Sequence, residues 1–512
     1  MIDRKSLCDL SLKGQGGKVN SLIRRFYQLW IVVLCFMAFC TGPRTEPQLD
    51  AEAELFSQLR QQGDAEFAKM HWRGWKNAAG FYEEALAKRD EVELRQRLFT
   101  AYILLSLRET ELFFRDESWL QKAEELLPRV PEMPCTAYLA IAQKKFYVHA
   151  LNPGGFAHKT LELEKYPLSR ETGSALSHYL YLLFLRLVAG RDSTAKLINE
   201  ENEFRRLYGN SNLAVYLSSN TPQEMAEKLA AFPDFAEMVM LRGNWHNTGK
   251  KYQAALADYQ RAVEIMPVLY KARNAMATLC YSLQEYEQAL LYYGQTLEIY
   301  PLEPAALFGR AICLSELRRY DESDRALREM IEKQSFYHGE ANYYLAKNSY
   351  YRNRPEETRS YLNLAAAYIP DSPELNMLSG LLYLDRGQPG RAALDFSKVL
   401  EQQPQHAEAW YFLGQVARQE NKFREARSHF LSAIENFRRE LEDFDAKLAT
   451  MSREEGTDQY RRNYFLKRQR QRNEYAREAI GRLALLQKTF RKPPLPGLRE
   501  LLAELAVPPP GQ

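Results

Sequence analysis

A period of about 34 residues runs through the second half of this chain and constrains its fold more than any other feature. Small residues recur at separations of 34, 34, 35, 34 and 34, at Gly243, Ala277, Ala311, Ala346, Gly380 and Gly414. Twelve residues after each stands Ala, Ser or Thr, and four residues further stands Tyr, Leu or Phe. Because all three columns keep the same phase, the chain contains six copies of one structural unit.

The spacing within a unit predicts a pair of helices. Two amphipathic stretches flank a short polar break, and the small residue of the first helix lets the second helix approach closely. The Tyr, Leu or Phe then fills the remaining gap at the i,i+4 spacing of one helical face. Prolines close four of the six units. Since each helix pair leaves an apolar side uncovered, neighbours must stack, which predicts an all-α fold, an α-solenoid of stacked helix-turn-helix hairpins.

This pattern resembles the tetratricopeptide repeat (TPR) family, whose unit has 34 residues. The clearest unit, residues 407–440, matches the family pattern at Trp410, Leu413, Gly414, Ala426, Phe430 and Ala433. The third and fourth units depart from it, with Ser323 and Thr358 in place of Ala and Ser335 in place of the closing Pro. The resemblance covers residues 236–440, about 40% of the chain. It implies a right-handed superhelix that binds other proteins.

The rest of the chain reads as flanking parts of different character. We divide the sequence into a signal or membrane-anchor segment with its tether (1–49), an irregular helical-hairpin block of degenerate repeats (50–235), the six repeats (236–440), and a C-terminal helical cap with a Pro-rich tail (441–512). In the block, Ala78, Tyr82 and Ala85 reproduce the spacing of a second helix. A long helix over residues 458–490 is placed to cover the end of the solenoid.

The N-terminal segment points to export. Residues 29–40 are uncharged and follow two arginines, a pattern typical of a secretory signal, because a membrane-spanning helix needs about 20 apolar residues. Cys40 stands where a lipoprotein carries its lipid, although Phe39 precedes it where a small residue is usual. The alternatives are a cleaved signal, an uncleaved anchor that extends back to Phe26, or a buried apolar helix of a cytosolic protein. We expect a cell-envelope protein, membrane-anchored and facing outside the cytoplasm.

Charge and motifs exclude several function classes. Lys and Arg number 69 against 66 Asp and Glu, which argues against a dedicated nucleic-acid binder. The basic tract 461–472 could touch anionic lipid or nucleic acid, but the overall balance favours the solvated face of a capping helix. Cys135, Cys280 and Cys313 lack metal-ligand spacing, so we expect buried thiols. No HExxH, GxSxG or P-loop pattern occurs. We therefore expect no enzyme, no cofactor, no metal and no nucleic-acid partner.

The concave face is the candidate site. In the family that the repeats resemble, first helices line the groove, and spacing from the small-residue column places twelve residues on that face. They are Asn244, Asn247, Lys271, Asn274, Tyr281, Phe308, Tyr343, Lys347, Tyr350, Tyr411, Gln415 and Arg418. Amide side chains can pair with the backbone of an extended or helical peptide, and aromatic anchors bury area at low entropic cost. The alternative interpretation is ordinary solvated helix faces with some packing aromatics.

These observations favour a noncatalytic adaptor that holds a protein partner of unknown identity in its groove at a bacterial envelope membrane. Two alternatives from other classes stay open. One is an enzyme with an unrecognised site in the 50–235 block, which a cluster of convergent polar groups there would favour. The other is a cytosolic regulator that contacts nucleic acid through the basic C-terminal helix.

Overall fold

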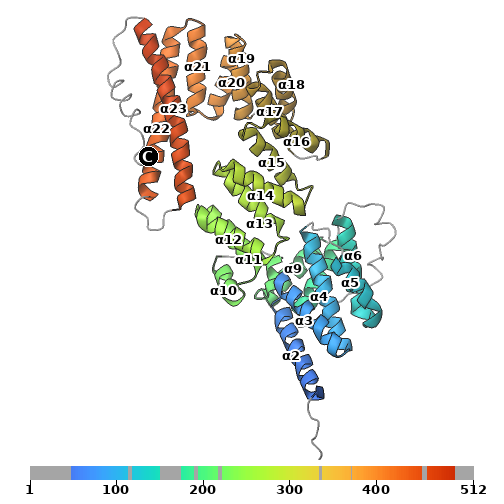
Figure 1. Cartoon of the computed structure of the whole chain (residues 1–512). Helices are drawn as coiled ribbons and strands as arrows, with labels where there is room; N and C mark the ends of the chain where they lie inside the picture. Colours follow the sequence, from blue (N-terminus) through green and yellow to red (C-terminus); the bar gives the residue numbers. More distant parts are fainter. Residues whose placement is uncertain are drawn as a thin grey trace, which may run out of the picture.

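The observed chain is a curved stack of helix pairs. The structure is a computed structural model and describes residues 48–112, 118–149, 174–188, 194–216, 222–333, 337–370, 372–451 and 458–489. Within these ranges the chain forms α-helices and two short 3-10 helices, without a strand. Helix pairs follow one another from α2 to α21, and the two last helices run back beside the stack (Figure 1). The predicted all-α solenoid is confirmed.

Six hairpins carry the 34-residue period. They are α11 (Ala236–Thr248) with α12 (Tyr252–Ile265), α13 (Tyr270–Ser282) with α14 (Tyr286–Ile299), α15 (Pro304–Glu316) with α16 (Tyr320–Lys333), α17 (His338–Tyr351) with α18 (Pro355–Ala366), α19 (Pro373–Asp385) with α20 (Pro389–Gln402), and α21 (Ala407–Gln419) with α22 (Phe423–Met451). The Tyr, Leu or Phe predicted to fill each hairpin is buried in all six. The sequence pattern therefore identifies the packed seam of each helix pair.

The backbone repeats with the same period. The turn inside each hairpin contains one residue in the left-handed region, with φ between 56° and 66°, at Lys250, Gln284, Arg318, Asn353, Gly387 and Asn421. Such a residue ends the first helix and lets the chain reverse, and most side chains adopt it at some cost. Only one of the six is glycine, so the stacked hairpins impose this conformation on ordinary residues.

The N-terminal part of the described chain is less regular. It contains α2 (Gln48–Ala68), α3 (Trp72–Lys88), α4 (Val92–Glu111), α5 (Ser118–Leu126), η1 (Leu127–Arg129), α6 (Glu132–His149), α8 (Ala175–Val188), α9 (Thr194–Tyr208), η4 (Asn212–Tyr216) and α10 (Pro222–Ala231). α2 and α3 form a further repeat-like hairpin. A Cβ on Gly63 would stand 2.5 Å from the ring of Tyr82, and Met70 supplies the left-handed turn residue. Ala78, Tyr82 and Ala85, whose spacing matches the second helix of a repeat, all belong to α3 of this hairpin.

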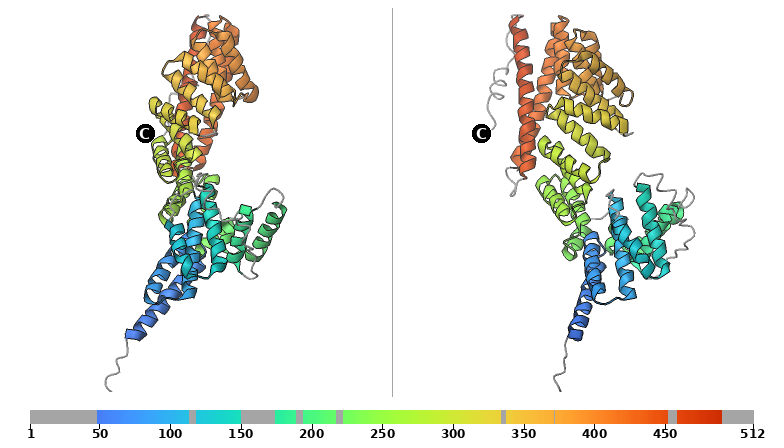
Figure 2. Two further views of the ribbon diagram at one scale, coloured as in Figure 1. Left: turned by 90° about the vertical axis from the view of Figure 1, so that its right-hand side faces the viewer. Right: turned by 45° about the vertical axis from the view of Figure 1, so that its right-hand side comes forward.

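The chain ends its described part in a long helical hairpin. α22 runs beyond the sixth repeat, and α23 (Gln459–Thr489) returns alongside it (Figures 1 and 2). Ala476, Ala479, Ile480 and Leu483 are buried in one core with residues of α21 and α22 such as Phe430. This face of α23 packs against the last hairpin of the solenoid.

The remaining sequence predictions have different outcomes. Cys135, Cys280 and Cys313 are free and buried, as predicted, and burial raises the pKa of Cys280 and of Cys313 to about 12. The signal-like run 29–40, with the candidate lipid-anchor residue Cys40, lies outside the described residues. None of the described helices combines the length and the apolar character that crossing a membrane requires.

Candidate partner-binding groove

The first helices of the repeats line the inner side of the curve. First helices of neighbouring hairpins contact one another from α11 through to α21. On a curved stack the inner helices are the ones that crowd together, while the outer helices spread apart. α16 and α18 accordingly lie on the outer side in Figure 1. The predicted groove residues on α13, α15 and α17 therefore belong to helices that line the concave side.

Aromatic side chains form one continuous surface in the middle of this face. We call it the tyrosine wall: Tyr281 on α13, Phe308 on α15, and Tyr343, Tyr344, Tyr350 and Tyr351 on α17. The hydroxyls of Tyr281 and Tyr344 lie 3.1 Å apart, which joins the second repeat to the fourth. The ring of Phe308 meets Tyr344 edge to face, with the centroids 5.8 Å apart. Side chains from three helices thus present one surface.

Charges at the wall are paired and fixed. Lys347 Nζ donates to Glu316 Oε1 at 2.7 Å and lies 5.3 Å from the ring centroid of Tyr344. Burial alone would lower the pKa of Lys347, but the carboxylate of Glu316 outweighs it and raises the pKa. Burial raises the pKa of Tyr281 and of Tyr343 above the ordinary value. At neutral pH the wall therefore offers neutral phenols beside one ion pair.

At the lower end of the groove, predicted residues are engaged within the first repeat. Asn244 Oδ1 accepts a hydrogen bond of 2.8 Å from the Tyr259 hydroxyl, and the side chain of Asn247 lies near the same hydroxyl. Lys271 is exposed. Asn274 differs, because its buried Oδ1 has no hydrogen-bond partner among the described residues. The two amides nearest the start of the repeats thus position Tyr259, while Asn274 keeps a free acceptor.

At the upper end, the C-terminal helix covers the predicted face. Tyr411 retains only 2% of its exposure, and its hydroxyl donates to Glu478 Oε1 of α23 at 2.7 Å. Gln415 and Arg418 are half-buried on the same helix. A partner can therefore reach Tyr411 only if α23 moves away. The repeat spacing alone could not predict that α23 lies over Tyr411.

Two residues of the tyrosine wall are absent from the groove residues predicted by the repeat spacing, but another pattern in the sequence identifies them. Tyr344 and Tyr351 each follow a predicted residue by one position, and with Tyr337 they recur every seven residues. Seven residues make almost two full helical turns, so Tyr344 and Tyr351 share one face of α17, while Tyr337 directly precedes that helix. Tyr337 stacks on Phe308 with the centroids 4.9 Å apart, and Tyr351 is 61% exposed. A search for aromatic heptads would have found them.

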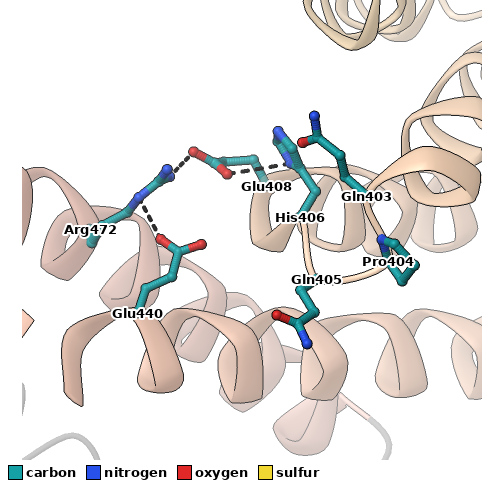
Figure 3. Close-up of a pocket in the computed structure, with 7 residues that line it drawn as sticks. All are labelled: Gln403, Pro404, Gln405, His406, Glu408, Glu440 and Arg472. Atoms are coloured by element: carbon teal, nitrogen blue, oxygen red, sulfur yellow. Dashed lines mark hydrogen bonds and ion pairs between the residues drawn. The ribbon is translucent and has the colours of Figure 1, made fainter. Parts of the chain in front are cut away.

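A polar hollow of about 490 Å³ lies where α23 meets the last repeats (Figure 3). Arg472 of α23 forms ion pairs with Glu408 and with Glu440, the latter at 2.7 Å between Nε and Oε2. Burial and the nearby Arg472 lower the pKa of His406, whose Nδ1 caps α21 by accepting from Ala409 N at 3.2 Å. Each charged group already has a partner, so these residues clamp three helices together.

The N-terminal block contains a cluster of convergent polar groups, the feature that would favour an enzyme. Arg108 Nε donates to Glu237 Oε1 at 2.9 Å and Arg108 Nη1 to Glu111 Oε2 at 2.8 Å, while Lys145 pairs with Glu111. Burial alone would raise the pKa of Glu111, but Lys145 and Arg108 outweigh it and lower the pKa to about 2. Both acids are paired with bases from other helices, so the cluster joins the block to α11.

Comparison with known proteins identifies the repeats. The sequence pattern described as tetratricopeptide repeat matches residues 274–338 and 377–440. Tetratricopeptide repeat protein 8 of Caenorhabditis elegans is 25% identical over 249 residues, which cover 40% of this chain and 47% of that protein. The chain thus spans about half the length of this curated relative. The match identifies residues 274–338 and 377–440 as tetratricopeptide repeats.

Solved structures similar to this chain include YrrB, Cut9–Hcn1 and PilW. YrrB, described as a TPR protein with an unusual peptide-binding site, is 22% identical, with a TM-score of 0.28 over 35% of this chain and 91% of its own. The hetero-tetramer Cut9–Hcn1 is 13% identical, with a TM-score of 0.37, and the match covers 88% of this chain and 96% of the other. PilW, a type IV pilus biogenesis factor, is 16% identical, with a TM-score of 0.32, and the match covers 42% of this chain and 96% of PilW.

Proposed function

We propose that this protein holds a segment of a partner protein against its tyrosine wall and is tethered at a cell-envelope membrane, facing outside the cytoplasm. Its tetratricopeptide repeats support a protein–protein interaction scaffold, and the wall is the surface to which we assign that role. The single observation that carries the proposal is the continuous aromatic surface on α13, α15 and α17. Aromatic side chains gathered on a rigid concave face are the usual anchors of protein interfaces.

The chemistry of the wall suits a peptide backbone. Each phenol can donate and accept a hydrogen bond, and its ring buries area while only two side-chain torsions are fixed. Tyr350 is already held by a hydrogen bond of 2.7 Å from its hydroxyl to Asp385 Oδ2, and Tyr351 stacks on Tyr320 with the centroids 6.2 Å apart. Because these rings are held in place before a partner arrives, binding orders few additional side chains.

The proposed location rests on the N-terminal sequence. Residues 29–40 form a short uncharged run after two arginines, and Cys40 ends that run. This pattern supports export followed by attachment to the membrane, through a lipid on Cys40 or through an uncleaved anchor. A tethered scaffold would present its groove to partners at the membrane surface.

Capture of a partner by matched tyrosine variants tests the proposal. Full-length protein is recovered from crosslinked cell envelopes beside a double variant, Tyr344→Ser with Tyr351→Ser, and a control variant, Tyr368→Ser. Tyr368 is 60% exposed against 61% for Tyr351, but it follows α18, at the opposite end of the same hairpin. We expect a partner that the wild type and the control recover and the double variant loses, at equal helical content. Equal recovery by all three proteins would refute the proposal.

A further inference from the structure

The hairpin of α22 and α23 is an arm whose two ends are held by different forces. At its base, α23 buries Ala479, Ile480 and Leu483 completely against the last repeat. The arm then runs back past the curved stack, and the start of α23 reaches α12 in the first repeat (Figure 1). The base is therefore an apolar core, and the contact at the tip closes the solenoid into a ring.

Polar groups make the directional contacts at the tip. Asp458 Oδ2 accepts a hydrogen bond of 2.6 Å from the backbone N–H of Gln253, in the first turn of α12. Its other oxygen accepts from Arg461 N at 3.0 Å, so one carboxylate caps the N-termini of α12 and α23 together. Lys467 Nζ lies 2.7 Å from Glu285 Oε1 in the second repeat, and these two side chains are 39% and 30% exposed.

Partly buried aromatic side chains complete the tip. Tyr460 and Tyr464 pack beside Tyr252 and Tyr292, around the core of the first two repeats. Tyr460, Tyr464 and Lys467 are spaced by four and three residues, which places them on one face of α23. None of these aromatic residues is fully buried, whereas the side chains of α23 that pack at the base are completely buried. The tip thus docks through directional polar contacts and through aromatic rings that are only partly buried.

Closure places α23 opposite the tyrosine wall. Arg468 lies within electrostatic reach of Tyr286, and Tyr475 lies within reach of Tyr351. The contacts that close the ring join residues 182 and 205 positions apart in the sequence. While the ring is closed, a partner segment must thread between α23 and the repeats, whereas an open ring admits it from the side.

We propose that the tip of the arm, residues 458–467, is a salt-sensitive latch that releases from the first two repeats and so opens the ring while the base stays packed. An exposed ion pair is weak and is screened by salt, whereas an apolar core is not. The latch goes beyond the proposed function and does not depend on it, because opening is measured without a partner.

Hydrogen exchange of the Gln253 amide in the full chain tests the latch. The variant Lys467→Glu places two carboxylates opposite each other, and the Gln253 amide loses its Asp458 acceptor when the tip leaves. We expect exchange at Gln253 to become about fivefold faster or more, while the amide of Tyr259 in the middle of α12 is unchanged. Adding Glu285→Lys restores the opposite charges and should return exchange to the wild-type rate. Unchanged exchange in the single variant, or no recovery in the charge swap, would overturn the proposal.

A salt titration of the unaltered protein removes the risk that the variant misfolds. Raising the salt concentration from about 0.05 M to about 0.5 M shortens the screening length severalfold and should speed exchange at Gln253 while leaving Tyr259 unchanged. Equal protection of Gln253 at both salt concentrations would contradict a latch held by charge.

Discussion

Gly414 lies so close to Phe430 that a Cβ on the glycine would stand 2.7 Å from the phenyl ring. The two residues belong to α21 and α22, and the ring fills the seam of the last hairpin, where it is completely buried. Real Cβ atoms do not approach a ring so closely. This contact explains why a small residue recurs at intervals of about 34 positions.

Replacing Gly414 with Ala should therefore destabilise the last hairpin by about 1–3 kcal/mol, because the ring must leave its site. Gly294 is the matched control, since it lies within α14 and a Cβ there meets no atom within 4 Å. Gly294→Ala should be neutral or stabilise by up to about 1 kcal/mol through helix propensity. Thermal melting followed by circular dichroism compares the two. Equal melting curves would show that the seam is assigned to the wrong residues.

Acid should weaken the junction between the N-terminal block and the repeats. The folded-state pKa of Glu111 is about 2, below the ordinary 4.5, so its contribution is complete above pH 4.5 and is lost as the pH falls towards 2. With 21% of the side chain exposed, we expect a contribution on the order of 2 kcal/mol. Denaturant unfolding between these pH values should show a shallower pH dependence for Glu111→Gln than for the wild type. Parallel curves would mean that Glu111 does not stabilise the junction through its charge.

Release of the latch should increase access to the groove. If α23 obstructs entry, Lys467→Glu should recover more partner from crosslinked envelopes than the wild type, and the charge swap with Glu285→Lys should recover the wild-type amount. Arg470→Glu is the control, because Arg470 lies in the same basic tract but is exposed. Greater recovery by the control as well would trace the effect to net charge and not to the latch.

The mode of attachment is decided at Cys40. If a lipid is attached there, Cys40→Ser should move the protein from the membrane fraction to the soluble fraction or trap the uncleaved precursor. An uncleaved anchor predicts that the variant stays in the membrane at an unchanged mass. Fractionation followed by mass spectrometry of the intact chain separates these outcomes. Recovery of the wild type from the cytoplasm would contradict the proposed location.

The sequence predicts the regular part of the fold because the period is local. Each unit specifies its own hairpin, so six copies reinforce one interpretation. The hairpin of α2 and α3 follows the same design, but its small residue escapes the period. Gly63 and Tyr82 are 19 positions apart, whereas Gly243 and Tyr259 are 16 apart. The turns of the two hairpins are equally long, but Tyr82 lies about one helical turn further into α3 than Tyr259 lies into α12. A fixed spacing between the small residue and the ring therefore does not detect this hairpin.

The candidate site is only partly predictable, because closure of the ring is a long-range property. Spacing places Tyr343, Tyr350 and Tyr411 on the same face of their helices. It does not show that α23 covers Tyr411 or that Lys467 reaches Glu285, since both depend on the accumulated curvature of the six hairpins. Short-range periodicity fixes which way a side chain points, but the overall path of the chain decides what lies opposite it.

Photocrosslinking from the groove tests the central claim most directly. A photoreactive phenylalanine analogue at position 351, and separately at position 368, reports which proteins lie within reach of each side chain in living cells. The tyrosine wall predicts a discrete crosslinked partner from position 351 and none from position 368. The same adducts from both positions, or none from position 351, would contradict a groove that binds its partner through Tyr351 and its neighbours.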